Sequence, residues 1–340
     1  MDISPDLIDA VEALAPELIA VPGVTGVGLG LREENEEFFD ELVVRVLVAD
    51  ASDVPAGVPE SIVGLPICIV ESPVEPLFDP DTSRYGASPQ PDLPGGAQIQ
   101  QAPEASGTLG AIVQDGNGVE VGLTCHHVSG GPGTPVWQPI APSIIQGGPP
   151  ADLTDALGQT IKVESPATAS QTIPVPSGPA LLLGGRLDAA TVSLDEARKQ
   201  GRTISHAIVD GFGVVDSTKP PSVPMFVKKR GSQSGPTTGL VTGITFMPWE
   251  GDQVPTPPPG HRFFMSRQYE IFFTPGGCPD GIFAKPGDSG SLVLQDGTHT
   301  AVGLLWGGDK KNKAGGKRGF MSDITLVESM LGITVAWTAQ

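Results

Sequence analysis

The chain has 340 residues and a formal net charge of −19 at pH 7. This acidity argues against a nucleic-acid partner, because phosphate binding needs clustered Lys and Arg. Uninterrupted apolar runs stay shorter than the ~20 residues of a membrane span, so we expect no membrane partner. Three cysteines are too few and too odd in number for a disulfide framework. We therefore expect a reduced, cytoplasmic protein without a signal peptide.

The N-terminal part has the pattern of a small α/β module. Apolar residues recur every three or four positions over residues 5–20, which predicts an amphipathic helix. Three strands are predicted after it, at residues 24–31, 42–48 and 66–71. We assign residues 1–75 to this module and the following Pro- and Gly-rich residues 76–104 to a linker.

From residue 105 to residue 340 the pattern becomes mainly β. Short β-branched runs alternate with Gly and Pro clusters, as expected for many short strands joined by turns. Strands are predicted at residues 108–114, 119–124, 189–192, 225–228, 239–246, 268–274, 290–295 and 300–306. Residues 141–182 are rich in Pro, Gly and Ser and are predicted to form a surface insertion. The strand spacing favours paired β-barrels or a β-sandwich.

The segment from Pro286 to Val293 reads Pro-Gly-Asp-Ser-Gly-Ser-Leu-Val, which is typical of a nucleophile loop. A Gly-flanked serine before an apolar strand can present its hydroxyl while backbone N–H groups face an incoming carbonyl oxygen. We predict Ser289 as the nucleophile and the N–H groups of Gly287 and Ser289 as the oxyanion hole. Asp288 is expected to hold this loop from below.

A serine nucleophile needs a base that is itself oriented by a carboxylate. The segment Leu-Thr-Cys-His-His-Val offers two histidines at the end of a predicted strand, where neighbours point to opposite faces. We prefer His127 to His126. For the acid we prefer Asp188, because it opens the small apolar stretch Asp-Ala-Ala-Thr-Val, with Asp155 as the alternative.

The order His, Asp, Ser along the chain is that of the chymotrypsin-type proteases. Six segments carry the resemblance: Gly95-Gly96, Gly107-Thr108-Leu109-Gly110, Leu-Thr-Cys-His-His-Val, Leu-Asp-Ala-Ala, Lys-Lys-Arg-Gly and Pro-Gly-Asp-Ser-Gly-Ser. Together they resemble the chymotrypsin-like (trypsin-fold) serine peptidases, in particular the intracellular bacterial peptidases related to the plant narrow-leaf type proteins. The resemblance implies a double six-stranded β-barrel, endopeptidase activity through an acyl-enzyme, and no required cofactor.

Two features depart from the secreted relatives. No Ile-Val-Gly-Gly start precedes the barrels, so we do not expect activation by a new N-terminus that pairs with Asp288. The residue six positions before Ser289 is Phe283, where trypsin-type enzymes carry an acid. With Trp306 and Gly307 it is expected to line a substrate pocket for small or apolar side chains.

Other interpretations stay open. We expect no metal site, because Cys125 lacks a second ligand pair with zinc-like spacing and is better explained as a buried thiol. The expected partner is a peptide or protein substrate, and the N-terminal module is a candidate for homo-oligomer formation. The alternatives to a serine endopeptidase are a catalytically silent peptide-binding or assembly protein on the same fold, and an esterase.

Overall fold

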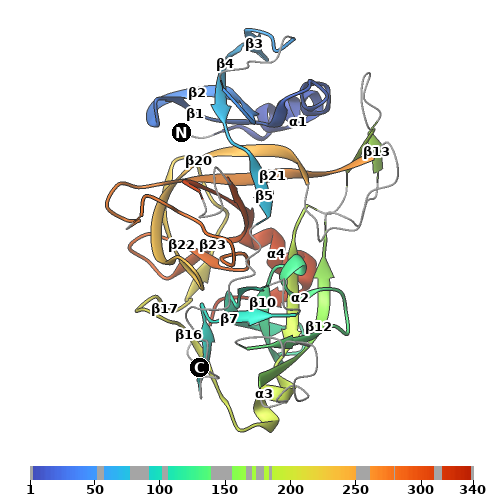
Figure 1. Ribbon diagram of the computed structural model, residues 1–340, viewed down its shortest axis with the longest axis vertical. Coiled ribbons are helices and arrows are strands. Elements are labelled where there is room, and N and C mark those ends of the chain that lie inside the picture. Colours follow the sequence, from blue (N-terminus) through green and yellow to red (C-terminus); the bar gives the residue numbers. More distant parts are fainter. Residues whose placement is uncertain are drawn as a thin grey trace, which may run out of the picture.

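The computed structural model describes most of the chain (Figure 1). The described residues are 3–51, 57–76, 92–101, 106–138, 155–165, 171–173, 180–183, 186–249, 261–278, 280–309 and 316–337. Within them the helices are α1 (Pro5–Ile19), α2 (His126–Ser129), α3 (Asp195–Lys199) and α4 (Ile324–Leu331). None of these helices of the described residues has both the length and the apolar character needed to cross a membrane.

The N-terminal module packs helix α1 against a small sheet. Ser4 caps the helix by accepting a hydrogen bond from the Leu7 N–H at 3.3 Å, and Pro5 occupies the first turn. Its buried face, which includes Val11 and Leu18, lies against strands of the module. The strands are β1 (Val24–Glu34), β2 (Glu37–Val48), β3 (Ser61–Ile62) and β4 (Leu65–Glu71). The predicted helix and three predicted strands are confirmed.

A closed ring of six strands follows the module in space. Its members are β19 (Met225–Gly231), β20 (Gly235–Trp249), β21 (His261–Phe273), β24 (Arg318–Asp323), β23 (Thr300–Asp309) and β22 (Leu292–Gln295). The pairing of β20 with β21 closes the ring. Alternate residues point inward and form an apolar core, as in Val227, Val241 and Val293.

The other large sheet holds eight strands in one path. In order they are β25 (Ile333–Thr334), β9 (Ala111–Asp115), β10 (Glu120–Thr124), β15 (Ala189–Ser193), β12 (Ala156–Glu164), β11 (Pro135–Trp137), β7 (Gln98–Gln100) and β8 (Ser106–Thr108). Beside it β17 (Gly213–Val214), β16 (Thr203–Ile208) and β6 (Asp92–Gly95) form a three-stranded sheet. The predicted fold class, mainly β with barrel-like sheets and a small α/β module, is confirmed.

The prediction of a surface insertion over residues 141–182 is wrong for the part that the structure describes. Strand β12 pairs with β15 inside the eight-stranded sheet. Buried and exposed residues do not alternate regularly along it, so no period-2 pattern marks this strand in the sequence. Strands β13 (Gln171–Ile173) and β14 (Ala180–Leu183) extend the ring at β21. Residues 141–154, 166–170 and 174–179 of the expected insertion lie outside the described residues.

The expected linker, residues 76–104, also contains paired strands. Strand β6 pairs with β16, and β7 pairs with β8 and β11. Residues 77–91 and 102–105 lie outside the described residues. The domain boundaries at residues 75 and 105 stay a prediction.

The module is continuous with the ring, because β1 pairs with β20 from Val27↔Phe246 to Gly30↔Gly243. Beside this seam lies a buried network of two arginines and two glutamates. Arg45 contacts Glu33 and Glu270, each at 2.8 Å, and Arg318 contacts the same two carboxylates. Burial alone would raise the pKa of Glu33, but Arg318 and Arg45 lower it below its ordinary value. The four charged side chains therefore stabilise the pairing of β1 with β20 only when all four are present.

We predict that Arg45→Met destabilises the chain by about 3–5 kcal/mol, because it leaves Glu270 and Glu33 buried with half of their cationic partners. Urea denaturation at pH 7 measures this. The control is Arg32→Met, which removes partly exposed pairs with Glu34 and Glu41 and is expected to cost less than about 1 kcal/mol. Equal effects of the two substitutions would contradict a structural role for the buried network.

Candidate active site

His127 and Asp188 come together at the ends of two paired strands. Strand β10 ends at Thr124, which pairs with Ala190 of β15, so the residues after Thr124 and before Ala190 must meet. The backbone N–H of His127 donates to Asp188 Oδ1 at 3.1 Å, and His127 Nδ1 contacts Asp188 Oδ2. Both side chains are buried. The backbone contact holds the carboxylate beside His127, and the contact at Nδ1 orients the imidazole ring with Nε2 on the side away from the carboxylate.

His126 lies beside His127 but has a different environment. The two residues begin the short helix α2 instead of ending a strand, so the expected strand alternation is wrong at this point. A helical turn still rotates successive side chains apart, and His126 is only partly buried. Burial lowers the pKa of His126, and His127 lowers it further, against the opposite effect of Asp188. The net effect lowers the pKa of His126 and favours its neutral form.

Ser289 is fully buried, and its hydroxyl donates to the carbonyl of Trp306 at 2.8 Å. A hydroxyl carries one proton, so in this conformation that proton is not given to His127. The backbone of the loop is tied to the other sheet, because Thr108 N–H donates to Ser289 O at 2.7 Å. The carbonyl of Gly287 accepts from Thr108 Oγ1 and Ser232 Oγ at 2.9 and 2.8 Å. The nucleophile loop is thus ordered, with its hydroxyl directed toward β23.

Glycines allow the two halves of the site to approach each other. A Cβ on Gly290, whose φ is +93°, would lie 2.2 Å from the carbonyl oxygen of Thr108. A Cβ on Gly107 would lie 2.4 Å from Val128 and 2.9 Å from Ser289 O. The residue next to His127 and the backbone of Ser289 therefore flank the same glycine.

Asp288 is the most constrained residue of the loop. Its Oδ2 accepts from Lys229 Nζ and the Lys285 N–H, both at 2.9 Å. Its Oδ1 accepts from the backbone N–H groups of Gln233 and Ser234, both at 3.0 Å. Burial alone would raise the pKa of Asp288, but Lys229 and the backbone donors lower it below its ordinary value. The expectation that Asp288 holds the loop from below is confirmed.

Lys229 is the partner that the sequence did not reveal. Both Lys229 and Asp288 are fully buried, and burial lowers the pKa of Lys229 while Asp288 raises it. The alternation of side chains along β19 indicated a buried position for this lysine, because Val227 and Lys229 lie on the same inward face of the strand. A lysine on an inward face requires a buried anion. Asp288 therefore has a cationic partner within the chain.

The three residues predicted for a substrate pocket lie in different settings. Phe283 is fully buried in the ring core, with Lys229 Nζ 5.2 Å from its ring centroid. Trp306 is buried and donates from its indole N–H to Gln268 at 2.8 Å. Gly307 lies on β23 next to Trp306. Their role in substrate binding stays a prediction.

Trp249 was missed by the sequence analysis. Its ring lies 6.0 Å from the His127 ring and 4.9 Å from the Trp306 ring, centroid to centroid. It comes from the end of β20, far from both residues in sequence. No local pattern marks a tryptophan of this kind, because the contact depends on the pairing of the ring strands. It therefore lies close to both His127 and Trp306 of β23.

Cys125, His127 and Asp188 bring three possible metal-ligating atoms within 4.8 Å of one another. The Cys125 thiol is fully buried and donates to the carbonyl of Leu305 at 3.2 Å. Burial raises the pKa of Cys125 well above its ordinary value, and Asp188 raises it further. A metal site needs the thiolate, so these contacts favour a protonated structural thiol.

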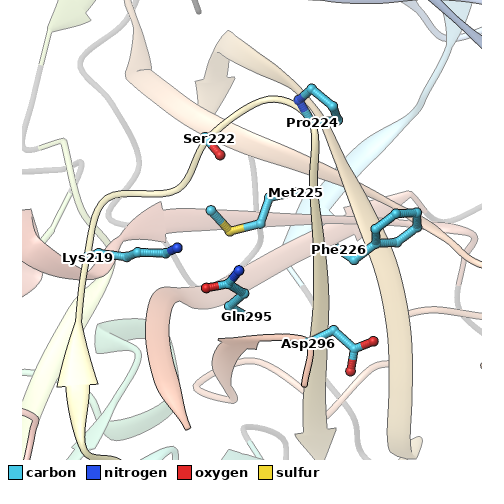
Figure 2. A pocket seen from close by; sticks show the side chains of 7 residues that line it. All are labelled: Lys219, Ser222, Pro224, Met225, Phe226, Gln295 and Asp296. Carbon is cyan, nitrogen blue, oxygen red and sulfur yellow. The ribbon is translucent and has the colours of Figure 1, made fainter. Parts of the chain in front are cut away.

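A separate pocket of about 520 Å³ lies at the end of β22 opposite to Ser289. Figure 2 shows the side chains of Met225, Lys219 and Gln295 converging there. No group that we assign to the candidate active site lines it. The pocket is therefore separate from the residues of the candidate active site.

No protein-family model matches the chain, and no curated protein matches it in sequence. Solved structures similar to it include Nocardiopsis protease, Thermobifida fusca Protease A and Cellulomonas bogoriensis chymotrypsin. Their identities to this chain are 15%, 17% and 18%, and their TM-scores are 0.43, 0.43 and 0.44. The matches cover 72%, 73% and 73% of this chain and 100% of each of the three structures.

We predict that Lys229→Met destabilises the chain by about 3–5 kcal/mol, because Asp288 then stays buried without its cation. Adding Asp288→Asn to Lys229→Met should restore much of that stability, since the uncompensated charge is removed. Thermal unfolding of the three chains measures both effects. The control is Lys228→Met on the other face of β19, with an expected cost below about 1 kcal/mol. A double variant no more stable than Lys229→Met would contradict the charge argument.

Proposed function

We propose that the chain is a serine endopeptidase that cleaves peptide bonds through Ser289, His127 and Asp188. The observation that carries the proposal is the double contact between His127 and Asp188. It holds the imidazole with Nδ1 toward the carboxylate, so that Nε2 is the nitrogen available to a serine hydroxyl. The ring contact at Nδ1 orients the imidazole, and the backbone N–H of His127 holds the same carboxylate in place beside it.

The proposed reaction begins with a rotation of the Ser289 side chain. Its hydroxyl leaves the Trp306 carbonyl and turns to His127 Nε2, which takes the proton as Oγ attacks the substrate carbonyl. Asp188 stabilises the resulting imidazolium, and the N–H groups of Gly287 and Ser289 are proposed to bind the oxyanion. His127 then returns the proton to the leaving amine. Water releases the acyl group by the same route.

A catalytically silent peptide-binding protein is the second candidate. The bond from Ser289 to Trp306 favours it, because a hydroxyl directed at a carbonyl is not activated by a base. A fluorophosphonate probe separates the two proposals, since it reacts with an activated serine. Labelling that is lost in Ser289→Ala supports the enzyme, and no labelling of the native chain supports the silent protein.

We predict that Ser289→Ala and His127→Ala each reduce peptide turnover by roughly 10⁴-fold or more, and to a similar degree, because a triad acts as a unit. His126→Ala is the matched control, since it removes the adjacent imidazole and should leave most of the activity. Cleavage of a proteome-derived peptide library measures turnover. If His126→Ala were inactive and His127→Ala active, the assignment of the base would be reversed.

A further inference from the structure

Strand β23 has two edges, and their partners can be followed residue by residue. Strand β24 occupies one edge, from Gly303↔Asp323 to Gly308↔Gly319. Strand β22 occupies the other, from Leu292↔Leu304 to Leu294↔Ala301. The second edge is the one that leads to the candidate nucleophile, because β22 follows Ser289 directly in the chain.

Beyond β22 the nucleophile loop continues along this second edge. The N–H of Leu305 donates to Ser291 O at 3.0 Å, and the N–H of Gly290 donates to Leu305 O at 2.8 Å. The next carbonyl of β23, that of Trp306, accepts from Ser289 Oγ. An extended segment paired with β23 just beyond Trp306 must therefore lie next to Ser289.

A strand of the chain itself lies at that place. Strand β5 (Val74–Pro76) pairs antiparallel with β23 as Pro76↔Gly307, Glu75↔Gly308 and Val74↔Asp309. Gly307 and Gly308 also pair with β24, so β5 must lie on the opposite edge, in line with β22 and Ser289. Figure 1 shows β5 running from the N-terminal module down toward the ring.

We propose that β5 occupies the substrate's position on β23 and acts as an intramolecular competitor of extended peptides. The proposal rests on the function proposed above. A peptide that adds to a sheet edge gains main-chain hydrogen bonds along its length, and the stretch of this edge beyond the residues that pair with β22 and the nucleophile loop begins at Gly307. Strand β5 runs from Asp309 toward Gly307, and thus toward the nucleophile, as a substrate strand with antiparallel pairing would.

The module holds β5 in position. Just before β5, the N–H of Ser72 donates to Val48 O at 2.9 Å, and Thr25 Oγ1 donates to Ser72 O at 2.8 Å. These bonds tie the start of β5 to β2 and β1. A tethered segment has a high effective concentration at its target, so three paired residues can compete with a free peptide. We infer that the module regulates access to the site.

The test removes the backbone donors of β5. Val74→Pro combined with Glu75→Pro deletes whichever N–H group faces β23, since the third residue is already a proline. Val74→Ala combined with Glu75→Ala is the matched control, because it changes the same side chains and keeps both N–H groups. Each full-length chain is assayed with an extended peptide substrate and with a small fluorophosphonate probe.

We expect the double proline variant to have a KM for the extended peptide that is lower by roughly tenfold or more. The reason is that only molecules in which β5 has left β23 can bind the peptide, so the apparent affinity is reduced by the fraction of such molecules. The rate of labelling by the probe should match that of the alanine control. Equal KM values in all chains that the probe labels would overturn the competitor proposal and leave the peptidase intact. No labelling of the native chain would overturn the proposed function, and this proposal with it.

A second double variant tests the same contact if the proline substitutions unfold the module. Glu75→Cys combined with Gly308→Cys places two thiols at directly opposite positions of the ladder, while the native cysteines that the structure describes are all buried. Oxidation should abolish cleavage of the extended peptide and retain labelling by the probe, and reduction should restore cleavage. Full cleavage by the disulfide-linked chain would contradict the proposal.

Discussion

The candidate site depends first on the buried Asp288 carboxylate. A buried ion pair by itself gives little net stability, because desolvation offsets the attraction. Here Lys229 supplies one of four donors, and three backbone N–H groups supply the others. Such a carboxylate is satisfied only when β19, the turn after it and the nucleophile loop hold their present positions. The conformation of the loop is therefore set by residues within the chain, without any new N-terminus.

The second constraint is the close approach of the two large sheets. His127 and Asp188 come from one sheet, and Ser289 comes from the ring, so the constellation exists only if the sheets meet without intervening side chains. Gly107 and Gly290 permit this contact, because any larger residue at either position would displace backbone. The arrangement of the three candidate residues thus depends on the packing at two glycines.

Strands and a helix whose apolar residues recur periodically could be predicted from the sequence. The sequence motifs also pointed to His127 and Asp188, which the structure brings into contact. The sequence also predicted the structural role of Asp288. It did not predict the ion pair with Lys229 or the contact of Trp249 with His127, because both depend on strand pairing between distant segments. The same reason explains the error over residues 156–164 and the strands within the expected linker. A three-residue strand such as β5 leaves no periodic signal at all.

Strand β23 contacts both the candidate nucleophile and β5. Its edge holds the Ser289 hydroxyl at Trp306 and β5 at the following residues, so under the competitor proposal an arriving extended peptide would displace both. A backbone hydrogen bond contributes a net ~0.5–1.5 kcal/mol, so a three-residue strand is held by only a few kcal/mol. A peptide that pairs with β23 over more residues than β5 gains more free energy than holds β5 in place, whereas a short peptide gains less. Competition at this edge would then select substrates by length of extended contact before any side chain is recognised.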